Sequence, residues 1–338
     1  MFTENSNDGD ISLVRDKTQP RINGSHSGLI TVSSSIATSS LPWPETAVEP
    51  VQIRWRYAIG IPFIHLLACL ALVPWLFSWT GVACAFFGLY VFGTLGINLG
   101  YHRLLTHHGL VAPKWLEHGL AILGVCTLQD TPACWIAMHR VHHQHSDERP
   151  DPHSPLVNLL WGHCGWLIFQ NRNFLNLNYY QQFTRDILRD PFYMKLERNN
   201  NWLWVYIASM LFFLIAGLTI GWLINGSALD AMQFGLSLVL WGVFVRTVLT
   251  WHITWSINSL THIWGYQNYE TGDSSRNNIL VGLWSNGEGW HNNHHADQRA
   301  AAHGHKWWEI DVTWITIRVL EMLGLVTQVV RPRAWTEQ

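Results

Sequence analysis

Three short histidine blocks carry the chemistry that this sequence predicts. They are His102 to His108 (HRLLTHH), His139 to His143 (HRVHH) and His291 to His295 (HNNHH). Because positions i, i+3 and i+4 share one face of a helix, we expect each His-x-x-His-His block to aim three imidazoles into the same volume. Eight or nine neutral nitrogen donors exceed what one four-coordinate zinc ion uses, and imidazole also suits iron. The blocks therefore predict a site for two metal ions.

The following histidines and the five cysteines are not predicted to bind the metals. Histidines remote from the blocks are expected to be structural or incidental: His26, His65, His118, His252, His303 and His305. His145, His153 and His163 follow the second block closely and are expected to orient ligands or to make structural hydrogen bonds. The five cysteines form no Cys-x-x-Cys pair, so the sequence predicts neither a disulfide framework nor a thiolate zinc site.

The composition points to a membrane. Apolar residues make up 48% of the 338 residues and charged residues 13%, whereas a soluble domain has about a quarter charged. The 21 tryptophans suit the two membrane interfaces, where an apolar ring with one donor is half solvated. The net charge is -2, and the basic residues form no dense patch that could neutralise phosphates. A nucleic-acid partner is therefore not expected.

Four apolar runs are long enough to cross about 30 Å of hydrocarbon. They form two hairpins with short turns: Tyr57–Phe77 with Gly81–Gly100, and Trp202–Leu223 with Met232–Trp255. Long polar stretches lie between the hairpins and after the second one. A weaker apolar segment, Leu120–Cys126, is expected to lie on the membrane surface or to be partly embedded in the membrane. The predicted fold is an all-α membrane protein whose helical cap holds the histidine-rich site.

Positive charge predicts the orientation. Of the 21 Lys and Arg residues, five precede the first run, nine lie between the hairpins, six follow the last run, and one, Arg246, falls within it. Because positive residues mark the cytoplasmic face, both termini and all three blocks should be cytoplasmic. Arg246 indicates that the fourth helix leaves the bilayer or faces a polar cavity. Residues 1–50 read as a disordered tail without a cleaved signal, and 51–338 as one integral-membrane domain.

The sequence motifs in and around the histidine blocks resemble those of a known family. HRVHHQHSD is followed by DPH and GHCGWL, and NSLTH and GEGWHNNHH come nearer the C-terminus. From about Trp55 to Leu325 the chain resembles the membrane fatty-acyl desaturases of the delta-9 type. The resemblance implies insertion of a cis double bond into a saturated acyl chain, using dioxygen, two electrons and two iron ions. The implied metal ligands are His102, His107, His139, His142, His143, His262, His291, His294 and His295, with Asn258 reaching one metal through water.

The resemblance also implies the partners. The substrate is a fatty-acyl chain held in a tunnel between the spanning helices and the cap, partly lined by Trp255. Animal acyl-CoA enzymes carry an Arg-Lys pair near the positions of Gln170 and Asn171, which this chain lacks, so the carrier is either a CoA thioester or a membrane lipid. No heme-binding module is fused at either end, so electrons are expected from a separate donor such as a ferredoxin or a cytochrome.

Two other functions compete with desaturation. A membrane hydroxylase of the same superfamily shares the first hydrogen abstraction, and the motifs NSLTH and GEGWHNNHH favour the desaturase over it. A non-catalytic protein that binds or transports metal would favour ionisable residues along several spans. Here the blocks gather on one predicted side of the membrane instead.

Overall fold

The computed structural model describes residue 41, residues 50–170 and residues 177–336. Every element in these ranges is a helix, and other pairing is limited to isolated bridges such as that between Val111 and Thr327. Helical stretches long and apolar enough to cross a membrane are Trp55–Leu72, Trp79–Thr106, Pro191–Asn225 and Ala228–Leu260. The expectation of an all-α protein with four candidate spans is confirmed.

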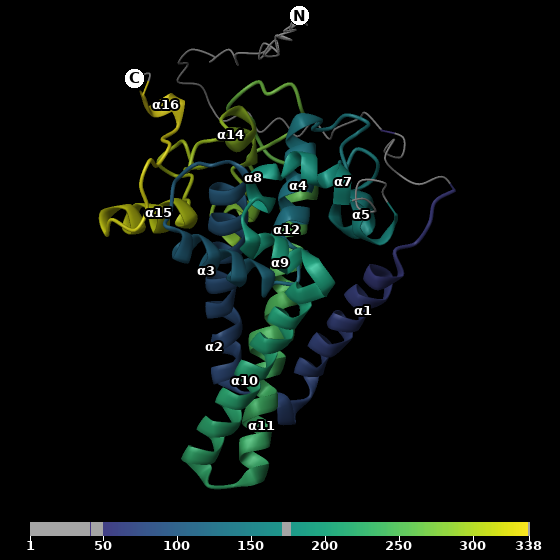
Figure 1. Cartoon of the computed structure of the whole chain (residues 1–338), viewed down its shortest axis with the longest axis vertical. Coiled ribbons are helices and arrows are strands. Elements are labelled where there is room, and N and C mark those ends of the chain that lie inside the picture. The colour runs from purple at the N-terminus through teal and green to yellow at the C-terminus, as the bar shows by residue number, and fades with distance from the viewer. Residues whose placement is uncertain (1–40, 42–49, 171–176, 337–338) are drawn as a thin grey trace, which may run out of the picture.

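The spans form two hairpins (Figure 1). The first consists of α1 (Trp55–Cys69), the 3₁₀ turns η1 (Leu70–Leu72) and η2 (Pro74–Leu76), α2 (Trp79–Gly88) and the π-helical η3 (Leu89–Thr106). The second consists of α10 (Asn201–Asn225), α11 (Ala228–Val239), the π-helical η7 (Leu240–Val245) and α12 (Arg246–Leu260). π-helical segments are often found at functional sites, and η3 contains most of the first histidine block.

Several ends of the spans differ from the predicted ones, and the third candidate span begins at Pro191 and not at Trp202. The first stretch stops at Leu72 and not at Phe77, because Val73 is extended and Pro74 has no N–H to continue the helix. The second and fourth run on past the apolar pattern, to Thr106 and Leu260. Their apolar windows are 39% and 44% buried, against 6% for the first stretch. Residues 101–106 are buried and residues 256–260 are buried or half-buried, so other parts of the protein cover these ends and their residues need not be apolar.

The other helices form a cap at one end of the hairpins (Figure 1). They are α3 (Lys114–Val125), α4 (Pro132–Gln144), η4 (Trp161–Gly165), α5 (Trp166–Ile168), α7 (Leu177–Tyr180), η5 (Gln181–Phe183), α8 (Arg185–Leu188), α9 (Pro191–Glu197), η6 (Arg198–Asn200), α13 (Ile279–Trp284), α14 (His291–Ala296), α15 (Val312–Met322) and α16 (Arg333–Thr336). The third candidate span includes α9 and η6, where Asn199 and Asn200 have positive φ and bend the chain into α10.

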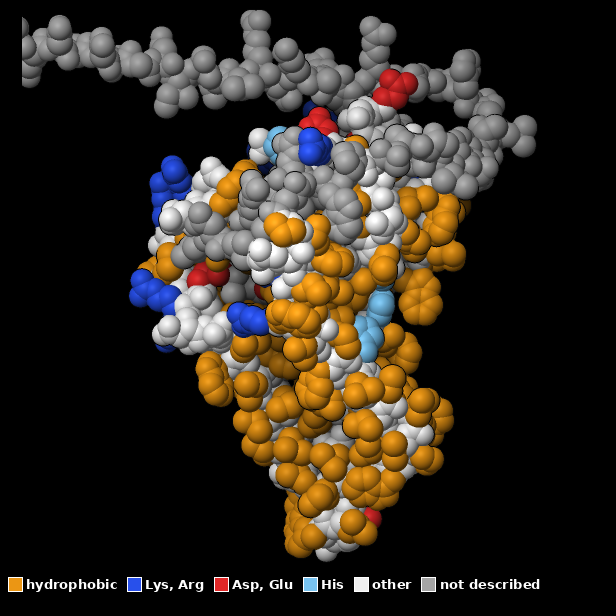
Figure 2. All heavy atoms as spheres, turned by 90° about the vertical axis from the view of Figure 1, so that its right-hand side faces the viewer, with side chains coloured by type: hydrophobic (Ala, Val, Ile, Leu, Met, Phe, Trp, Pro, Cys, Tyr) orange, Lys and Arg blue, Asp and Glu red, His pale blue; other side chains and the backbone are white. Residues whose placement is uncertain are grey.

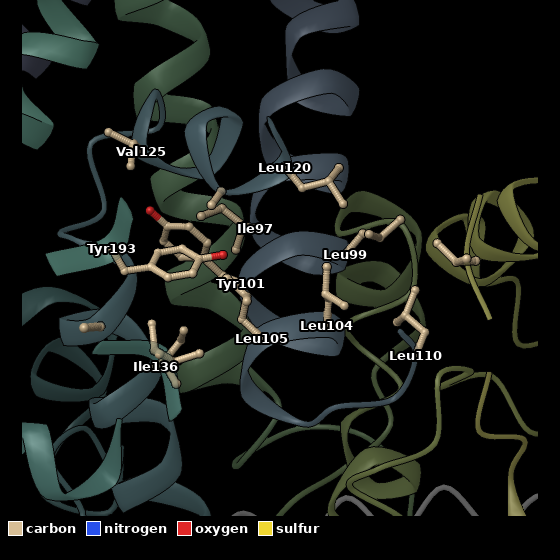
Figure 3. Close-up of a cluster of buried hydrophobic side chains, with 14 of the residues drawn as sticks. Ile97, Leu99, Tyr101, Leu104, Leu105, Leu110, Leu120, Val125, Ile136 and Tyr193 are labelled. Atoms are coloured by element: carbon tan, nitrogen blue, oxygen red, sulfur yellow. The ribbon is translucent and has the colours of Figure 1, made fainter. Parts of the chain in front are cut away.

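A buried apolar cluster joins the cap to the second span (Figure 3). Leu120 and Val125 of α3 pack against Ile97 and Tyr101 of η3, and Ile136 of α4 closes the cluster. The segment predicted to lie on the membrane surface is thus largely the second half of an amphipathic helix packed against a span. This packing fixes η3 relative to α4, the two elements that carry the first two histidine blocks.

The surface agrees with a membrane protein. Apolar side chains cover the lower part of the face shown in Figure 2, and most charged side chains on that face lie on the cap. Arg246 is fully buried, with Nη2 donating to the carbonyl oxygen of Cys126 at 2.8 Å and the guanidinium 3.9 Å from the ring centre of Phe92. It therefore faces the protein interior. The predicted tail over residues 1–50 lies outside the described residues apart from Leu41 and Pro50.

Candidate metal centre

Five histidines from three segments form the first histidine group: His102, His107, His139, His143 and His294. One ring nitrogen from each lies within 4.8 Å of the others. Nε2 of His294 lies 3.1 Å from Nε2 of His102 and 2.9 Å from Nε2 of His143. The nitrogen atoms of the group thus converge on one point from η3, α4 and α14.

Four further histidines form the second histidine group: His142, His262, His291 and His295. Nε2 of His291 lies 3.1 Å from Nε2 of both His262 and His295. The two groups are neighbours, since the ring centres of His143 and His295 are 4.5 Å apart. All nine histidines named as ligands by the resemblance are therefore in one of two adjacent groups, in the described part of the chain.

Each His-x-x-His-His block is divided between the groups. His139 and His143 of α4 point into the first group and His142 into the second, whereas His291 and His295 of α14 point into the second and His294 into the first. The expectation that one block aims three imidazoles into one volume was therefore wrong. Residues i and i+4 are close together around an α-helix, and residue i+3 lies about 100° from i+4, so a block can serve two centres.

The first block depends on the π-helical winding of η3. Residues five apart in an α-helix point about 140° away from each other. In η3 the N–H of His107 donates to the carbonyl oxygen of His102 at 3.2 Å, which is the i to i+5 bond of a π-helix. The two rings are consequently 4.8 Å apart, centre to centre. His108 has positive φ, and its side chain is 57% exposed beside Asp186, so it lies outside both groups.

Carboxylates fix the orientation of four of the nine rings. The Nδ1 atoms donate to carboxylate oxygens in the pairs His102–Glu288 at 2.5 Å, His142–Asp151 at 2.9 Å, His262–Asp147 at 2.9 Å and His295–Asp273 at 2.6 Å. With the proton on Nδ1, the lone pair of each Nε2 points into its group. The carboxylates also place negative charge around the two groups.

The protonation states suit a bound cation. Burial, followed by repulsion from neighbouring histidines, holds the pKa of His107, His139, His143, His291 and His294 well below its usual value, so these rings are neutral. Burial lowers the pKa of His262, but the charge of Asp147 outweighs it and raises that pKa to about 9. His262 therefore carries a second proton at neutral pH, and a metal ion bound at Nε2 would replace it. The same carboxylate makes the imidazole a stronger metal ligand.

Unpaired nitrogen atoms show that metal ions fit here. Nε2 of His107 and Nε2 of His142 are buried and have no hydrogen-bond partner. In the second group the Nε2 atoms of His262 and His295 both face Nε2 of His291, while their Nδ1 atoms donate to Asp147 and Asp273. Even with a second proton on Nε2 of His262, only one of these two contacts is a hydrogen bond, so in the other contact two lone pairs face each other unless a cation lies between them. An all-imidazole set of this size suits two ions of a metal such as iron.

Asn258 is on α12 and lines a cavity of about 280 Å³ that His139 and His153 also line. Most of the lining is apolar, including Ile61, Met138 and Trp255. The tunnel expected beside Trp255 therefore has a counterpart that reaches the first histidine group.

Sequence reasoning missed the residues around the ligands. They are Asp147, Asp151, Asp273 and Glu288, the buried Arg103, and His303, whose Nδ1 lies 3.3 Å from Glu288. A signal was present, because Asp147 and Asp151 follow the second block and Glu288 precedes the third by three residues. Two asparagines also anchor α14. Oδ1 of Asn292 accepts from the backbone N–H groups of Asn268 and Tyr269, and Oδ1 of Asn293 accepts from the side-chain amides of Asn268 and Asn277.

Comparisons with known proteins agree with this geometry. Residues 73–311 match the model of a family described as fatty acid desaturase. An sn-1 stearoyl-lipid 9-desaturase of Anabaena variabilis is 41% identical over 87% of this chain and 97% of its own length. An sn-2 palmitoyl-lipid 9-desaturase of Nostoc sp. (strain 36) is 39% identical over 85% and 93% of the two chains. An sn-1 stearoyl-lipid 9-desaturase of Synechocystis sp. is 40% identical over 86% and 84%.

Proposed function

This chain belongs to the fatty acid desaturase family, and on that basis we propose that it inserts a cis double bond at carbon 9 of a saturated acyl chain esterified to a membrane glycerolipid. It is an oxygen-dependent oxidoreductase of fatty-acyl chains. The reaction removes two hydrogen atoms from adjacent methylene groups. Dioxygen takes up these two hydrogen atoms together with two electrons and two protons from the donor and the solvent, and leaves as two water molecules. The position and the lipid carrier are supported by the names of the three relatives.

One observation carries the proposal: nine histidines form two adjacent groups, and one of them, His139, lines an apolar cavity. We propose that these histidines hold two iron ions and that Asn258 reaches one of them through water. The chemistry that bound iron supplies is the activation of dioxygen for removal of hydrogen from an unactivated methylene group. His303 and the four carboxylates then serve to hold the ligand rings and their protons in place.

The residues of the cavity would hold the acyl chain against this centre. Trp135, one turn before His139 on α4, and Met138, which directly precedes it, line the cavity, so a chain lying along them would present its methylene groups to the first histidine group. Trp255 lines the cavity on α12, one turn before Asn258. Apolar walls exclude water, which protects the reacting carbon from competing reactions.

The carrier is the point on which the sequence left two possibilities. Gln170 and Asn171 stand where animal acyl-CoA enzymes have a basic pair, and this difference favours a lipid over a CoA thioester. We further propose a separate electron donor, such as a ferredoxin or a cytochrome, that meets the cap. The distribution of Lys and Arg supports a cytoplasmic location for the cap and both termini.

Expression in a host without its own desaturase tests the function. Lipid classes are separated first, and the acyl chains are then analysed by gas chromatography and mass spectrometry after derivatisation of the double bonds. We expect a cis-9 monounsaturated chain in the glycerolipid fraction from the wild-type protein and from His145→Ala, and none from His142→Ala. His145 is a suitable control because it pairs with the exposed Glu148 and belongs to neither group.

The other outcomes are equally informative. A new double bond that appears first in acyl-CoA would overturn the lipid carrier. A hydroxylated chain would assign the protein to the sister chemistry of the superfamily. No product from the wild-type protein in the presence of an added donor would contradict the proposed reaction.

A further inference from the structure

The cavity beside the first histidine group has a thin outer wall made by α1. The cavity is lined on this side by Arg56, Tyr57, Gly60, Ile61, Phe63 and Ile64. Only 6% of the apolar window of the first span is buried, so the opposite face of α1 is free to contact lipid. Figure 1 shows α1 inclined away from the other helices towards its cap end. One helix therefore separates the cavity from the surrounding bilayer.

The wall has an opening at one edge. Arg56, Gly60 and Phe63 are one turn apart along α1, and Phe63 lines the cavity although its side chain is 55% exposed. A Cβ atom added at Gly60 would have no atom within 4 Å. Trp202 and Leu203, at the start of α10, line the cavity as well. The space between α1 and α10 thus connects the cavity with the outside of the protein at the level of the bilayer.

The rim of this opening is polar at one end and apolar along the rest. Arg56 is the second residue of the span and donates from Nη2 to Oδ1 of Asn200 at 3.1 Å in an exposed contact. An arginine at this level can keep its guanidinium among lipid head groups while its stem stays in the apolar region. Below it the rim is Gly60 and Phe63. This distribution matches a glycerolipid, with its polar glycerol at the interface and its chain below.

Polar contacts hold α1 on both sides of the opening. The hydroxyl of Tyr57 donates to Asp130 at the cap end. Two turns further along, Nε2 of His65 lies 3.0 Å from Nε2 of His252, and Nδ1 of His252 lies 3.0 Å from Nε2 of His163. Such contacts are costly to break in lipid, where water cannot replace them. These contacts therefore hold α1 in place on both sides of the opening at Gly60.

We propose that the acyl chain of a diacyl glycerolipid enters the cavity sideways from the bilayer, between α1 and α10 and past Gly60. This inference rests on the proposed lipid substrate and specifies its route. The glycerol and head group stay at the interface near Arg56, and the chain does not cross water. A substrate delivered as a water-soluble thioester would have no need of an opening at this level.

Photolabelling of the purified protein tests the route without needing turnover. The probes are phosphatidylglycerol and monogalactosyldiacylglycerol with a diazirine on the sn-1 stearoyl chain, each in phosphatidylcholine vesicles, and diazirine-stearoyl-CoA. The readout is the labelled peptide that contains Met138. This residue lines the cavity and is 2% exposed, so bulk lipid does not reach it.

The variants compare two open glycines. Gly60→Trp fills the passage, and Gly119→Trp places the same side chain on α3, where a Cβ atom also has nothing within 4 Å. We expect Gly60→Trp to lower lipid labelling of the Met138 peptide by at least about tenfold, because small changes in an apolar passage discriminate strongly. Gly119→Trp should label like the wild type. Gly60→Leu is the alternative if Gly60→Trp unfolds at a lower temperature than the control.

Two results would overturn different statements. If a lipid probe labels Met138 equally in the wild type, Gly60→Trp and Gly60→Leu, the sideways route is wrong and the lipid substrate stands. If only the CoA probe labels Met138 in the wild type, the lipid substrate is wrong and the route falls with it. Labelling by lipid that Gly60→Trp removes and Gly119→Trp retains supports both.

Discussion

Arg103 donates from Nε and Nη2 to one oxygen of Glu288, at 3.0 and 2.7 Å, while the other oxygen of Glu288 accepts the Nδ1 proton of His102 at 2.5 Å. Arg103 also makes two bonds to Asp311, at 2.9 and 3.0 Å. All of these side chains are buried. Burial raises the pKa of Glu288, but Arg103, His303 and His102 together hold it well below its usual value, so the carboxylate is charged.

Glu288→Gln removes this charge and keeps the shape. The buried guanidinium loses a partner, so we expect the free energy of unfolding to fall by about 3 kcal/mol. His102 also loses its orienting acceptor, and metal affinity should fall by roughly 10-fold to 100-fold. Thermal unfolding in detergent and metal per chain by mass spectrometry measure both effects. Glu148→Gln is the control, because its side chain is 68% exposed; equal stability and metal content in the two variants would contradict the assignment.

His107→Ala and His108→Ala should have opposite results although the residues are adjacent. The ring of His107 is buried in the first histidine group, whereas that of His108 is 57% exposed beside Asp186. We expect His107→Ala to lower bound metal and abolish desaturation, and His108→Ala to retain both. Metal content and the lipid profile of the expressing host are the measurements. Loss of metal in His108→Ala with retention in His107→Ala would reverse the assignment.

Gly124→Ala should disturb the packing of α3 on η3. A Cβ atom at Gly124 would lie 2.4 Å from Cε1 of Tyr101, which is closer than atoms can approach. Because the ring is fully buried and cannot move away freely, we expect a loss of about 2 kcal/mol in the free energy of unfolding. Gly119→Ala is the matched control on the same helix, with open space around its Cβ position. Stability should be unchanged or slightly higher there, since alanine favours a helix. Equal unfolding temperatures in the two variants would show that α3 can shift.

Removal of the metal should destabilise the cap. The Nε2 lone pairs of the second histidine group face one another, and a bound cation relieves that repulsion. A ligand present at about a thousand times its Kd stabilises a fold by roughly 4 kcal/mol, so we expect chelation to lower Tm by on the order of 10 °C. Calorimetry before chelation, after it and after return of ferrous iron measures the change. An unchanged Tm would indicate that the groups are held by the protein alone.

The sequence predicted the centres of the spans better than their ends. The apolar runs located all four spans, because hydropathy reports contact with lipid. Hydropathy could not place the ends of the second and fourth spans at Thr106 and Leu260. Residues there are covered by protein, so lipid no longer constrains their polarity. The π-helical winding of η3 was likewise not predicted, although it brings His102 and His107 together.

The histidines of the candidate centre were predicted more completely than their surroundings. Eight of the nine come from the three blocks, and His262 came only from the family resemblance, because a lone histidine has no spacing to mark it. The orienting carboxylates were missed for a similar reason. Glu288 is 186 positions from His102 and acts on it only after the chain folds. Residues that become neighbours only on folding leave no recognisable spacing in the sequence.

The division of the ligands among distant segments constrains how the protein is made. Each histidine group draws on α4, near the middle of the chain, and on α14, close to its end. During translation the first two blocks are complete long before His291, His294 and His295 leave the ribosome. Neither group can be finished until the second hairpin has been inserted and α14 has returned to the cap. A metal ion that needs a complete group would therefore bind only late in biogenesis, and a chain truncated before α14 would be left with incomplete sites.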